Sequence, residues 1–448
     1  MNKKPAKVTI VGAGLVGSLL SIYLRKRGYE VSVFDRRFDM RSNMLGGGRS
    51  INMALSNRGL RALQEVGLAD HLKNNAVPMN GRMIHDIRGT LTFQPYGATG
   101  QFINSISRSD LNMFLISEAE KLGVDFFFEH KCLDVNIDKT EVTFQNYGNT
   151  KHLPTDLIIG ADGSFSTVRG ALQITDRFEY SQKYIEHGYK ELRIPSGKDG
   201  SFLMEKEALH IWPRESFMLI ALPNPDASFT CTLFFPFDGD PSFQKLGSPE
   251  KIQTFFEASC PDATKLMPTL AEDFCDNPTS SLVTIRCLPW YKNNTLLIGD
   301  AAHGVVPFYG QGMNAGFEDC RVLNDLLNEY KDDWPRVFPE FQRQRKPDTD
   351  AIAQLALDNF VEMRDLVGDA DFLLRKKIEA KLHELYPEKW IPLYSMVTFH
   401  DTMRYSEALQ KGVEQKGIMD QVMKTPAIES TWQSLDFGKI VNHLMLLQ

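Results

Sequence analysis

The pattern of apolar and polar positions near the start of the chain predicts one βαβ unit. Residues 8–11 are mostly apolar and predict a buried strand, and residues 15–24 repeat leucine and isoleucine at helical spacing. A second apolar strand follows at residues 31–34 and stops at Asp35. This order of elements is typical of a doubly wound parallel sheet.

Two later segments repeat the arrangement of a strand followed by a glycine turn. Residues 157–159 form an apolar run that leads into a turn with Asp162 and then into a helix. Residues 295–298 form another apolar strand, and it ends just before Asp300. Glycines within residues 310–312 open a long helix. We therefore expect a buried parallel strand at residues 157–159 and a further strand at residues 295–298.

The middle of the chain has a different pattern. Long alternating strands in residues 189–237 predict an antiparallel sheet with one covered face. Residues 81–96 predict a hairpin that carries Arg82 and Tyr96. From residue 339 onward the chain has the pattern of amphipathic helices. The predicted class is α/β, with a Rossmann-like domain, an antiparallel-sheet domain and a helical C-terminal region.

Composition and charge exclude several functions. The net charge of −7 argues against a nucleic-acid surface. The six cysteines show no metal-ligand spacing, so no metal site is predicted, and free thiols indicate a reducing compartment. No signal peptide and no apolar run long enough for a membrane anchor is found. These features favour a cytoplasmic protein.

The glycine turn of the first βαβ unit predicts a dinucleotide site. Gly12 turns the chain, Gly14 lets the backbone approach a pyrophosphate, and Gly17 lets helix and strand pack closely. The pyrophosphate would lie at the helix N-terminus, where free N–H groups favour negative charge. Asp35 would accept hydrogen bonds from ribose hydroxyls. The motif alone does not distinguish FAD from NAD.

Three separated motifs occur together: the glycine turn, GADG at residues 160–163, and IGDAAH at residues 298–303. This combination resembles the FAD-dependent aromatic hydroxylases of the para-hydroxybenzoate hydroxylase type. The resemblance implies FAD, with Asp300 as an acceptor for the ribitol hydroxyls. It also implies that the helix at Gly312 points its N–H groups at the flavin, where its dipole would stabilise the charge of the reduced ring. His303 is interpreted as a packed turn histidine.

The resemblance implies a discontinuous FAD-binding domain of residues 1–75, 100–180 and 280–335. Residues 76–99 and 181–279 then form the substrate domain, and residues 336–448 form the helical C-terminal domain. Arg108 is expected to reach the phosphate region. The predicted cofactor residues are Gly12, Gly14, Leu15, Val16, Gly17, Asp35, Arg36, Arg37, Ala54, Arg108, Leu133, Asp162, Asp300, Gly312, Met313 and Asn314.

A second, more specific resemblance covers essentially the whole chain. Short segments that occur in the right order resemble the kynurenine 3-monooxygenase family; they are GRMIH, QPYG, HGYKEL, ALHIWP, VPFYGQGMN, DNFVEM and PLYSMVTF. L-Kynurenine is an amino acid, so its site needs a cation for the carboxylate, and the Arg82 guanidinium offers a two-pronged grip. Tyr96 and Tyr405 are expected to add phenolic hydrogen bonds.

The other substrate residues that the resemblance implies bind the amino-acid end or line a slot for the aromatic ring. They are Asn359, Met363, Ile211, Phe234, Pro307, Phe308 and Tyr309. No protein acid or base is assigned, because the amino group of kynurenine already activates the ring carbon. The protein's expected task is to orient the ring and exclude water.

The resemblance implies hydroxylation of L-kynurenine to 3-hydroxy-L-kynurenine with NADPH and O₂, through a flavin C4a-hydroperoxide. The protein would be a monomer or a homodimer, and the docking site of NADPH is not readable from the sequence. Alternatives are a hydroxylase of another aromatic acid or a phenol, a non-catalytic flavin-binding redox sensor, and an NAD-dependent dehydrogenase.

Overall fold

The computed structural model describes residues 7–42, 52–97, 100–366, 369–400 and 402–445. Its first βαβ unit forms as the sequence predicts, with α1 (Leu15–Lys26) between two parallel strands. The sheet around it has six strands in the order β18-β19-β12-β1-β2-β8, all parallel except for the edge strand β18. In that order the strands are Tyr291–Lys292, Thr295–Leu297, Leu157–Gly160, Lys7–Val11, Glu30–Phe34 and Asp125–Phe127.

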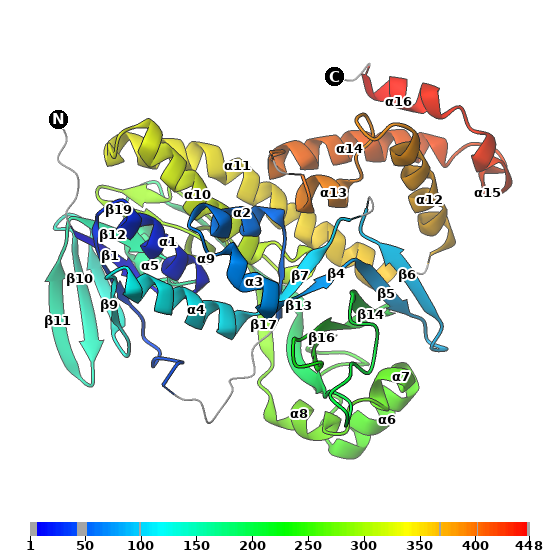
Figure 1. The fold of residues 1–448 in the computed structure, drawn as a ribbon, viewed down its shortest axis with the longest axis horizontal. Coiled ribbons are helices and arrows are strands. Elements are labelled where there is room, and N and C mark those ends of the chain that lie inside the picture. The colour runs from blue at the N-terminus through cyan, green and yellow to red at the C-terminus, as the bar shows by residue number, and fades with distance from the viewer. Residues whose placement is uncertain (1–6, 43–51, 98–99, 367–368, 401, 446–448) are drawn as a thin grey trace.

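Helices and two small sheets surround the parallel sheet (Figure 1). The helices are α2 (Asn57–Glu65), η1 (Ala69–His71), α3 (Leu72–Asn75), α4 (Arg108–Lys121), α5 (Thr167–Gln173), α9 (Asp300–His303), η2 (Pro307–Tyr309) and α10 (Gly312–Glu329). One small sheet has the order β11-β10-β9 and the other β3-β7-β4. Their strands are β3 (Asn52–Leu55), β4 (Ala76–Met79), β7 (Ile103–Ser107), β9 (Lys131–Asn136), β10 (Glu141–Asn146) and β11 (Asn149–Pro154). Because parallel strands end at the same sheet edge, the glycine turns after β1, β12 and β19 meet there.

The second large sheet has seven strands in the order β17-β13-β16-β15-β14-β5-β6. They are Ser280–Leu288, Glu179–Ile194, Phe229–Pro236, Phe217–Pro223, Ala208–Arg214, Gly81–His85 and Leu91–Pro95. Every pair is antiparallel except β14 with β5. Strand β17 lies within residues 280–335, yet it pairs with β13 in this sheet.

The two faces of the seven-stranded sheet pack against two different hydrophobic cores. One face packs against α6 (Pro249–Ser259), α7 (Pro261–Thr264) and α8 (Leu270–Asp276) around the buried Trp212. The other face belongs to a second core that includes Ile211 and Phe234 and contacts the C-terminal helices. Side chains on β14 therefore point alternately toward the two cores, as a period of two requires.

The C-terminal part is helical, and it begins at residue 334, slightly before the predicted start. Helix α11 (Trp334–Val361) is followed by a π-helical turn, Glu362–Leu366. The remaining helices are α12 (Ala370–Leu385), α13 (Leu393–Thr398), α14 (Tyr405–Val422), α15 (Ile428–Thr431), η4 (Trp432–Ser434) and α16 (Phe437–Met445). Among the described residues, no helix is both long and apolar enough to cross a membrane.

Candidate functional site

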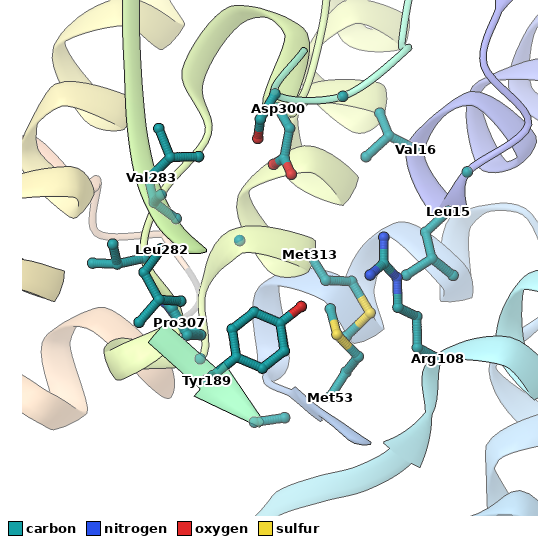
Figure 2. A pocket seen from close by; sticks show the side chains of 18 of the residues that line it. Leu15, Val16, Met53, Arg108, Tyr189, Leu282, Val283, Asp300, Pro307 and Met313 are labelled. Carbon is teal, nitrogen blue, oxygen red and sulfur yellow. The ribbon is translucent and has the colours of Figure 1, made fainter. Parts of the chain in front are cut away.

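A cavity of about 540 Å³ connects the carboxyl edge of the parallel sheet to one face of the seven-stranded sheet. Leu15, Val16 and Arg108 line it on one side, and Leu282, Val283 and Pro307 line it on the other (Figure 2). The cavity brings together the glycine turn and the Arg82 region, which the sequence predicts as the two ends of one site.

The glycine turn borders the cavity in a conformation that favours glycine. Gly12 has a φ of +109°, and a Cβ there would lie 2.3 Å from the Ala161 carbonyl oxygen. A Cβ at Gly17 would lie 2.0 Å from the Gly12 oxygen, so Gly17 serves packing and does not line the cavity. A Cβ at Gly14 would meet no described atom within 4 Å, so this glycine leaves room for a ligand.

Helix α1 begins at Leu15 with Gly14 as its N-cap, and no side chain caps it. The first amides of a helix lack intrahelical acceptors, and Leu15 and Val16 line the cavity. This N-terminus can therefore hold a phosphate group.

Asp35 lies at the same end of the cavity and is held by its neighbours. Its carboxylate accepts hydrogen bonds from Ala13 N at 2.8 Å and from the backbone and guanidinium of Arg37 at 2.8–3.0 Å. Burial alone would raise the pKa of Asp35, but the bonds from Arg37 and Ala13 lower it. Asp35 is therefore an ionised acceptor, and binding ribose hydroxyls would require it to exchange some bonds with Arg37. Arg36 and Arg37 also line the cavity.

Asp300 and Arg108 face each other across the middle of the cavity (Figure 2). Asp300 is exposed to the cavity; desolvation by the surrounding protein raises its pKa, and the charges of His303 and Arg108 lower it. Asp162 also lines the cavity, while its carboxylate accepts hydrogen bonds from Ser166 Oγ at 2.5 Å and Thr167 N at 2.7 Å. It thereby fixes the start of α5.

Helix α10 presents its N-terminus to the cavity. Gly310, in the left-handed region with a φ of +64°, turns the chain, and Gly312 and Met313 line the wall. Asn314 is fully buried and does not line the cavity. Its side chain donates to the Ala54 oxygen at 2.8 Å and accepts from Ser56 N at 2.9 Å, so it ties α10 to β3 and α2. Ala54 itself lines the cavity.

A buried ionic network holds the turn that carries Asp300. Asp319 accepts hydrogen bonds from His303 Nε2 at 2.5 Å, from Arg345 Nε at 2.7 Å and from Gly299 N at 3.2 Å. Burial alone would raise the pKa of Asp319, but His303 and Arg345 lower it. His303 is therefore a packed residue that does not line the cavity.

The other end of the cavity contains a half-buried cation, Arg82, among tyrosines. The Arg82 guanidinium carbon lies 4.7 Å from the Tyr394 ring centroid and 5.8 Å from the Tyr96 centroid. The Tyr394 ring stacks on Tyr96 at 5.2 Å and on Tyr309 at 5.3 Å. All four residues line the cavity. Burial raises the pKa of Tyr96 and Tyr309 well above its ordinary value, so both phenols stay neutral.

No carboxylate forms a salt bridge with Arg82 among the described residues, and its buried Nε has no hydrogen-bond partner there. Desolvation alone would lower the pKa of Arg82, but the nearby tyrosines and the charge of Glu362 raise it; Glu362 itself forms no salt bridge with Arg82 in the described part of the chain. A desolvated cation gains from a direct anionic partner. The arrangement can therefore accept a carboxylate from a ligand.

Tyr405 and Asn359, which the resemblance implies as substrate residues, do not line the cavity. The Tyr405 hydroxyl donates to Gln311 Oε1 at 2.8 Å, and the ring packs on Arg58 behind the cavity wall. Tyr394, at the start of α13, lies beside Arg82 instead. Asn359 does not line the cavity; its amide donates to the Phe308 oxygen at 2.6 Å and so positions η2.

Phe234, Pro307, Phe308, Tyr309 and Met363 line the predicted apolar slot. The Phe234 and Phe308 rings lie 4.9 Å apart, and Phe360 stacks behind Phe308 at 4.2 Å. Two other predicted contacts do not line the cavity. Ile211 is buried in the core behind this slot, and Leu133 is 40% exposed on β9.

Several lining residues were not singled out from the sequence. Among them are Met53, Met79, Ile103, His130, Lys131, Cys132, Phe165, Tyr189, Leu209, Met218, Ile220, Leu222, Thr232, Ser281, Leu282, Val283, Val305 and Tyr394. Tyr394 is part of the segment PLYSMVTF, so its motif was visible although its role was not. No cluster of three or more metal-ligating side chains occurs in the described part of the chain.

The fold and the glycine-lined cavity define an FAD-binding protein. The FAD binding domain family model matches residues 5–336, which confirms the predicted cofactor. The fold is similar to that of a mutant of 2-methyl-3-hydroxypyridine-5-carboxylic acid oxygenase, with a TM-score of 0.68 and 20% identity over 82% of this chain and 94% of that chain. The predicted class, an FAD-dependent hydroxylase fold, is therefore confirmed.

Comparison with named relatives identifies one family within this class. The chain is 50% identical to a kynurenine 3-monooxygenase of Flavobacterium psychrophilum over 437 residues, 96% of this chain and 97% of the relative. It is 51% identical to a kynurenine 3-monooxygenase of Christiangramia forsetii over 435 residues, 96% of this chain and 97% of the relative. The chain belongs to the kynurenine 3-monooxygenase family of flavoprotein monooxygenases.

Proposed function

We propose that this chain hydroxylates L-kynurenine to 3-hydroxy-L-kynurenine with FAD, NADPH and O₂. The observation that carries this proposal, besides family membership, is the half-buried Arg82 cation, which faces the cavity without a salt bridge among the described residues. The carboxylate of an amino acid would supply the missing charge in a two-pronged contact. Tyr96 and Tyr394 would add neutral phenolic donors.

The residues at the opposite end fit FAD. The α1 N-terminus would hold the pyrophosphate, Asp35 the adenosine ribose, and Asp300 the ribitol hydroxyls. The α10 N-terminus would lie against the pyrimidine edge of the flavin, where its dipole favours negative charge. When bound, FAD would accept electrons from NADPH and activate O₂.

The apolar slot supports an aromatic substrate. Phe234, Phe308 and Met363 surround the space between Arg82 and the flavin end of the cavity. They would orient the aniline ring and keep water out during oxygen transfer. Burial keeps the Tyr309 phenol neutral, so it cannot serve as a base, and we assign it to shaping the slot.

We extend the proposal to the organisation of the chain. The FAD-binding domain would comprise residues 1–75, 100–180 and 280–335. The substrate domain would comprise residues 76–99 and 181–279, and the helical C-terminal domain, residues 336–448, would close the site. All six cysteines are free thiols, which supports a reducing compartment such as the cytoplasm. A monomer or a homodimer remains our expectation for the assembly.

The test is product analysis with purified protein, L-kynurenine, NADPH and oxygen. We expect a visible flavin spectrum, NADPH oxidation that depends on L-kynurenine, and 3-hydroxy-L-kynurenine in an amount matching the NADPH consumed. A panel of phenols and benzoates serves as the control. Flavin-bound protein that oxidises NADPH with a phenol but not with L-kynurenine would overturn the substrate assignment. Flavin-bound protein without turnover would favour a sensor.

A further inference from the structure

The seven-stranded sheet carries Arg82 and Tyr189 on the face that borders the cavity, but on strands that are far apart. Arg82 is on β5 and Tyr189 is on β13, with β14, β15 and β16 between them. Neighbouring strands are about 4.8 Å apart, so these two strands are separated by about 19 Å along the sheet. Both side chains line the cavity. A ligand that contacts both must therefore extend across the sheet.

The strands between these two residues supply an apolar floor. Tyr189 is in register with Phe234, and Phe234 is in register with Met218. At the other edge Leu209 is in register with Arg82. Phe234, Met218 and Leu209 all line the cavity. This face of the sheet thus has a cation at one end, a phenol at the other and apolar side chains between them.

The hydroxyl of Tyr189 can bind a ligand. The side chain is half-buried, and the hydroxyl has no hydrogen-bond partner within the described part of the chain. Figure 2 shows this hydroxyl pointing into the cavity toward Met53 and Met313. Met313 is in the first turn of α10, whose N-terminus we assign to the flavin. The hydroxyl therefore lies on the flavin side of the apolar slot.

Two other hydroxyls of the apolar slot lie elsewhere. Tyr309 stacks on Tyr394 at 5.3 Å, and this pair lies at the Arg82 end of the cavity. Thr232 is on β16, where it is in register with Ile220 of β15, so its side chain belongs to the floor of the slot. Thr232 therefore offers a matched control for a variant of Tyr189.

The proposed substrate has polar groups that match the two ends of the sheet. L-Kynurenine carries a carboxylate at one end and an amino group on its aromatic ring at the other. One N–H of this amino group bonds to the neighbouring ketone oxygen within the substrate, and the second N–H points toward the ring carbon that is hydroxylated. A phenol oxygen can accept the second N–H. Such a contact would place the reacting carbon at the flavin end of the cavity.

We propose that Tyr189 is a specificity-determining residue whose hydroxyl oxygen accepts a hydrogen bond from the ring amino group of the substrate. This inference rests on the proposed function, because it takes L-kynurenine as the ligand and Arg82 as the partner of its carboxylate. The contact transfers no proton. Together the two contacts fix both ends of the substrate, so the amino-substituted edge of the ring faces the flavin. Binding then favours aromatic amino acids that carry an N–H group beside the ketone.

The test measures how the contributions of the Tyr189 hydroxyl and the ring amino group depend on each other. L-Kynurenine and 3-benzoyl-L-alanine, which lacks only that amino group, are titrated into FAD-bound full-length protein. The Kd is measured by the change in flavin absorbance, in wild type and in Tyr189→Phe. We expect the preference for L-kynurenine to be about fivefold smaller in the variant, because one neutral hydrogen bond is lost. The Kd of 3-benzoyl-L-alanine should change by less than about twofold.

Thr232→Val is the matched control, because it removes a hydroxyl from the same slot and leaves Tyr189 in place. Any change in its affinity should be equal for both ligands, so the ratio of the two Kd values should match that of the wild type. A wild-type ratio in Tyr189→Phe, or a fivefold loss of preference in Thr232→Val, would overturn the inference. Each ratio is measured within one variant, so a general loss of affinity does not change it.

A second readout is the share of consumed NADPH that yields 3-hydroxy-L-kynurenine. This share should fall in Tyr189→Phe, because the ring is oriented less firmly, and a share equal to that of the wild type would contradict the inference. If the wild type binds neither ligand, the proposed function fails together with the inference. If the wild type binds L-kynurenine and Tyr189→Phe keeps the same preference, only the role of Tyr189 fails.

Discussion

At its nucleotide end the cavity is bordered by one continuous βαβ unit, whereas at its Arg82 end it is bordered by side chains from distant segments. Gly12, Gly14 and Asp35 lie within 24 residues of one another in the chain. Arg82, Tyr309 and Tyr394 come from a sheet edge, a 3₁₀ turn and a C-terminal helix. A local motif therefore builds one end, and tertiary packing builds the other.

The buried ionic network around Asp319 joins the two ends. On one side Asp319 holds Gly299 and His303, next to Asp300. On the other side it binds Arg345, which also lies 2.7 Å from Glu318. Glu318 in turn binds Arg58, whose Nε donates to the Val397 oxygen of α13 at 2.9 Å. The helix that carries Tyr394 is thus connected to the turn that carries Asp300.

The largest effect is expected from Asp319→Asn, which removes the anion shared by both ends. Breaking a buried ion pair costs about 3–5 kcal/mol of unfolding free energy. Since the pKa of Asp319 is lowered in the fold, its contribution is complete above the pKa of an unfolded aspartate, about 4, and is lost as pH falls below it. Urea unfolding at pH 7 and pH 3 should show a gap between wild type and variant that shrinks at the lower pH. An equal gap at both would contradict this role.

Arg82→Ala is expected to weaken substrate binding strongly at the Arg82 end of the cavity and to leave FAD binding at the other end unchanged. Loss of a desolvated charged contact to a ligand costs about 2–5 kcal/mol, so the KM for L-kynurenine should rise about 30-fold or more. Bound FAD, measured by its absorbance after gel filtration, should stay stoichiometric. Unchanged KM would remove Arg82 from the substrate site, and loss of flavin would mean that the two ends are not separable.

Gly14→Val should affect the opposite end. The added side chain would meet no described protein atom near its Cβ, but it would fill the space that a pyrophosphate approaches. We expect a folded protein whose affinity for FAD falls about 10- to 100-fold, in line with the cost of overpacking. Circular dichroism and flavin titration measure the two properties. Gly17→Ala is the contrasting variant, because its Cβ would lie 2.0 Å from the Gly12 oxygen and should disturb the fold itself.

The smallest predicted effect is the difference in KM between Tyr394→Phe and Tyr405→Phe. Tyr394→Phe should raise the KM about fivefold, because one neutral hydrogen bond near Arg82 contributes about 1 kcal/mol. Tyr405→Phe should leave the KM within about twofold and lower the unfolding free energy by about 1 kcal/mol, because its hydroxyl bonds Gln311. The reverse result in kinetics and thermal unfolding would place Tyr405, and not Tyr394, at the substrate.

These two tyrosines also show where sequence reasoning reached its limit. The βαβ unit and the strand ends at Asp162 and Asp300 were predictable, because hydrophobic period and glycine placement are local. Arg82 was singled out from a short motif and lines the cavity, while its role toward a carboxylate stays a prediction. The choice between Tyr394 and Tyr405 depends on how α13 and α14 pack against β5 and α10, which no periodicity encodes. Likewise, β17 joins the seven-stranded sheet through a pairing with β13 about 100 residues earlier, and its own residues gave no sign of that partner.

The central claim is that Arg82 binds the carboxylate of an amino acid at one end of an FAD-containing cavity. Its most direct test compares L-kynurenine with kynuramine, which lacks only the carboxylate, in wild type and Arg82→Ala, by KM in product-coupled NADPH oxidation. We expect the wild type to prefer L-kynurenine by about 100-fold and the variant to treat both ligands alike. Equal KM values in the wild type, or a preference that survives in Arg82→Ala, would contradict the claim.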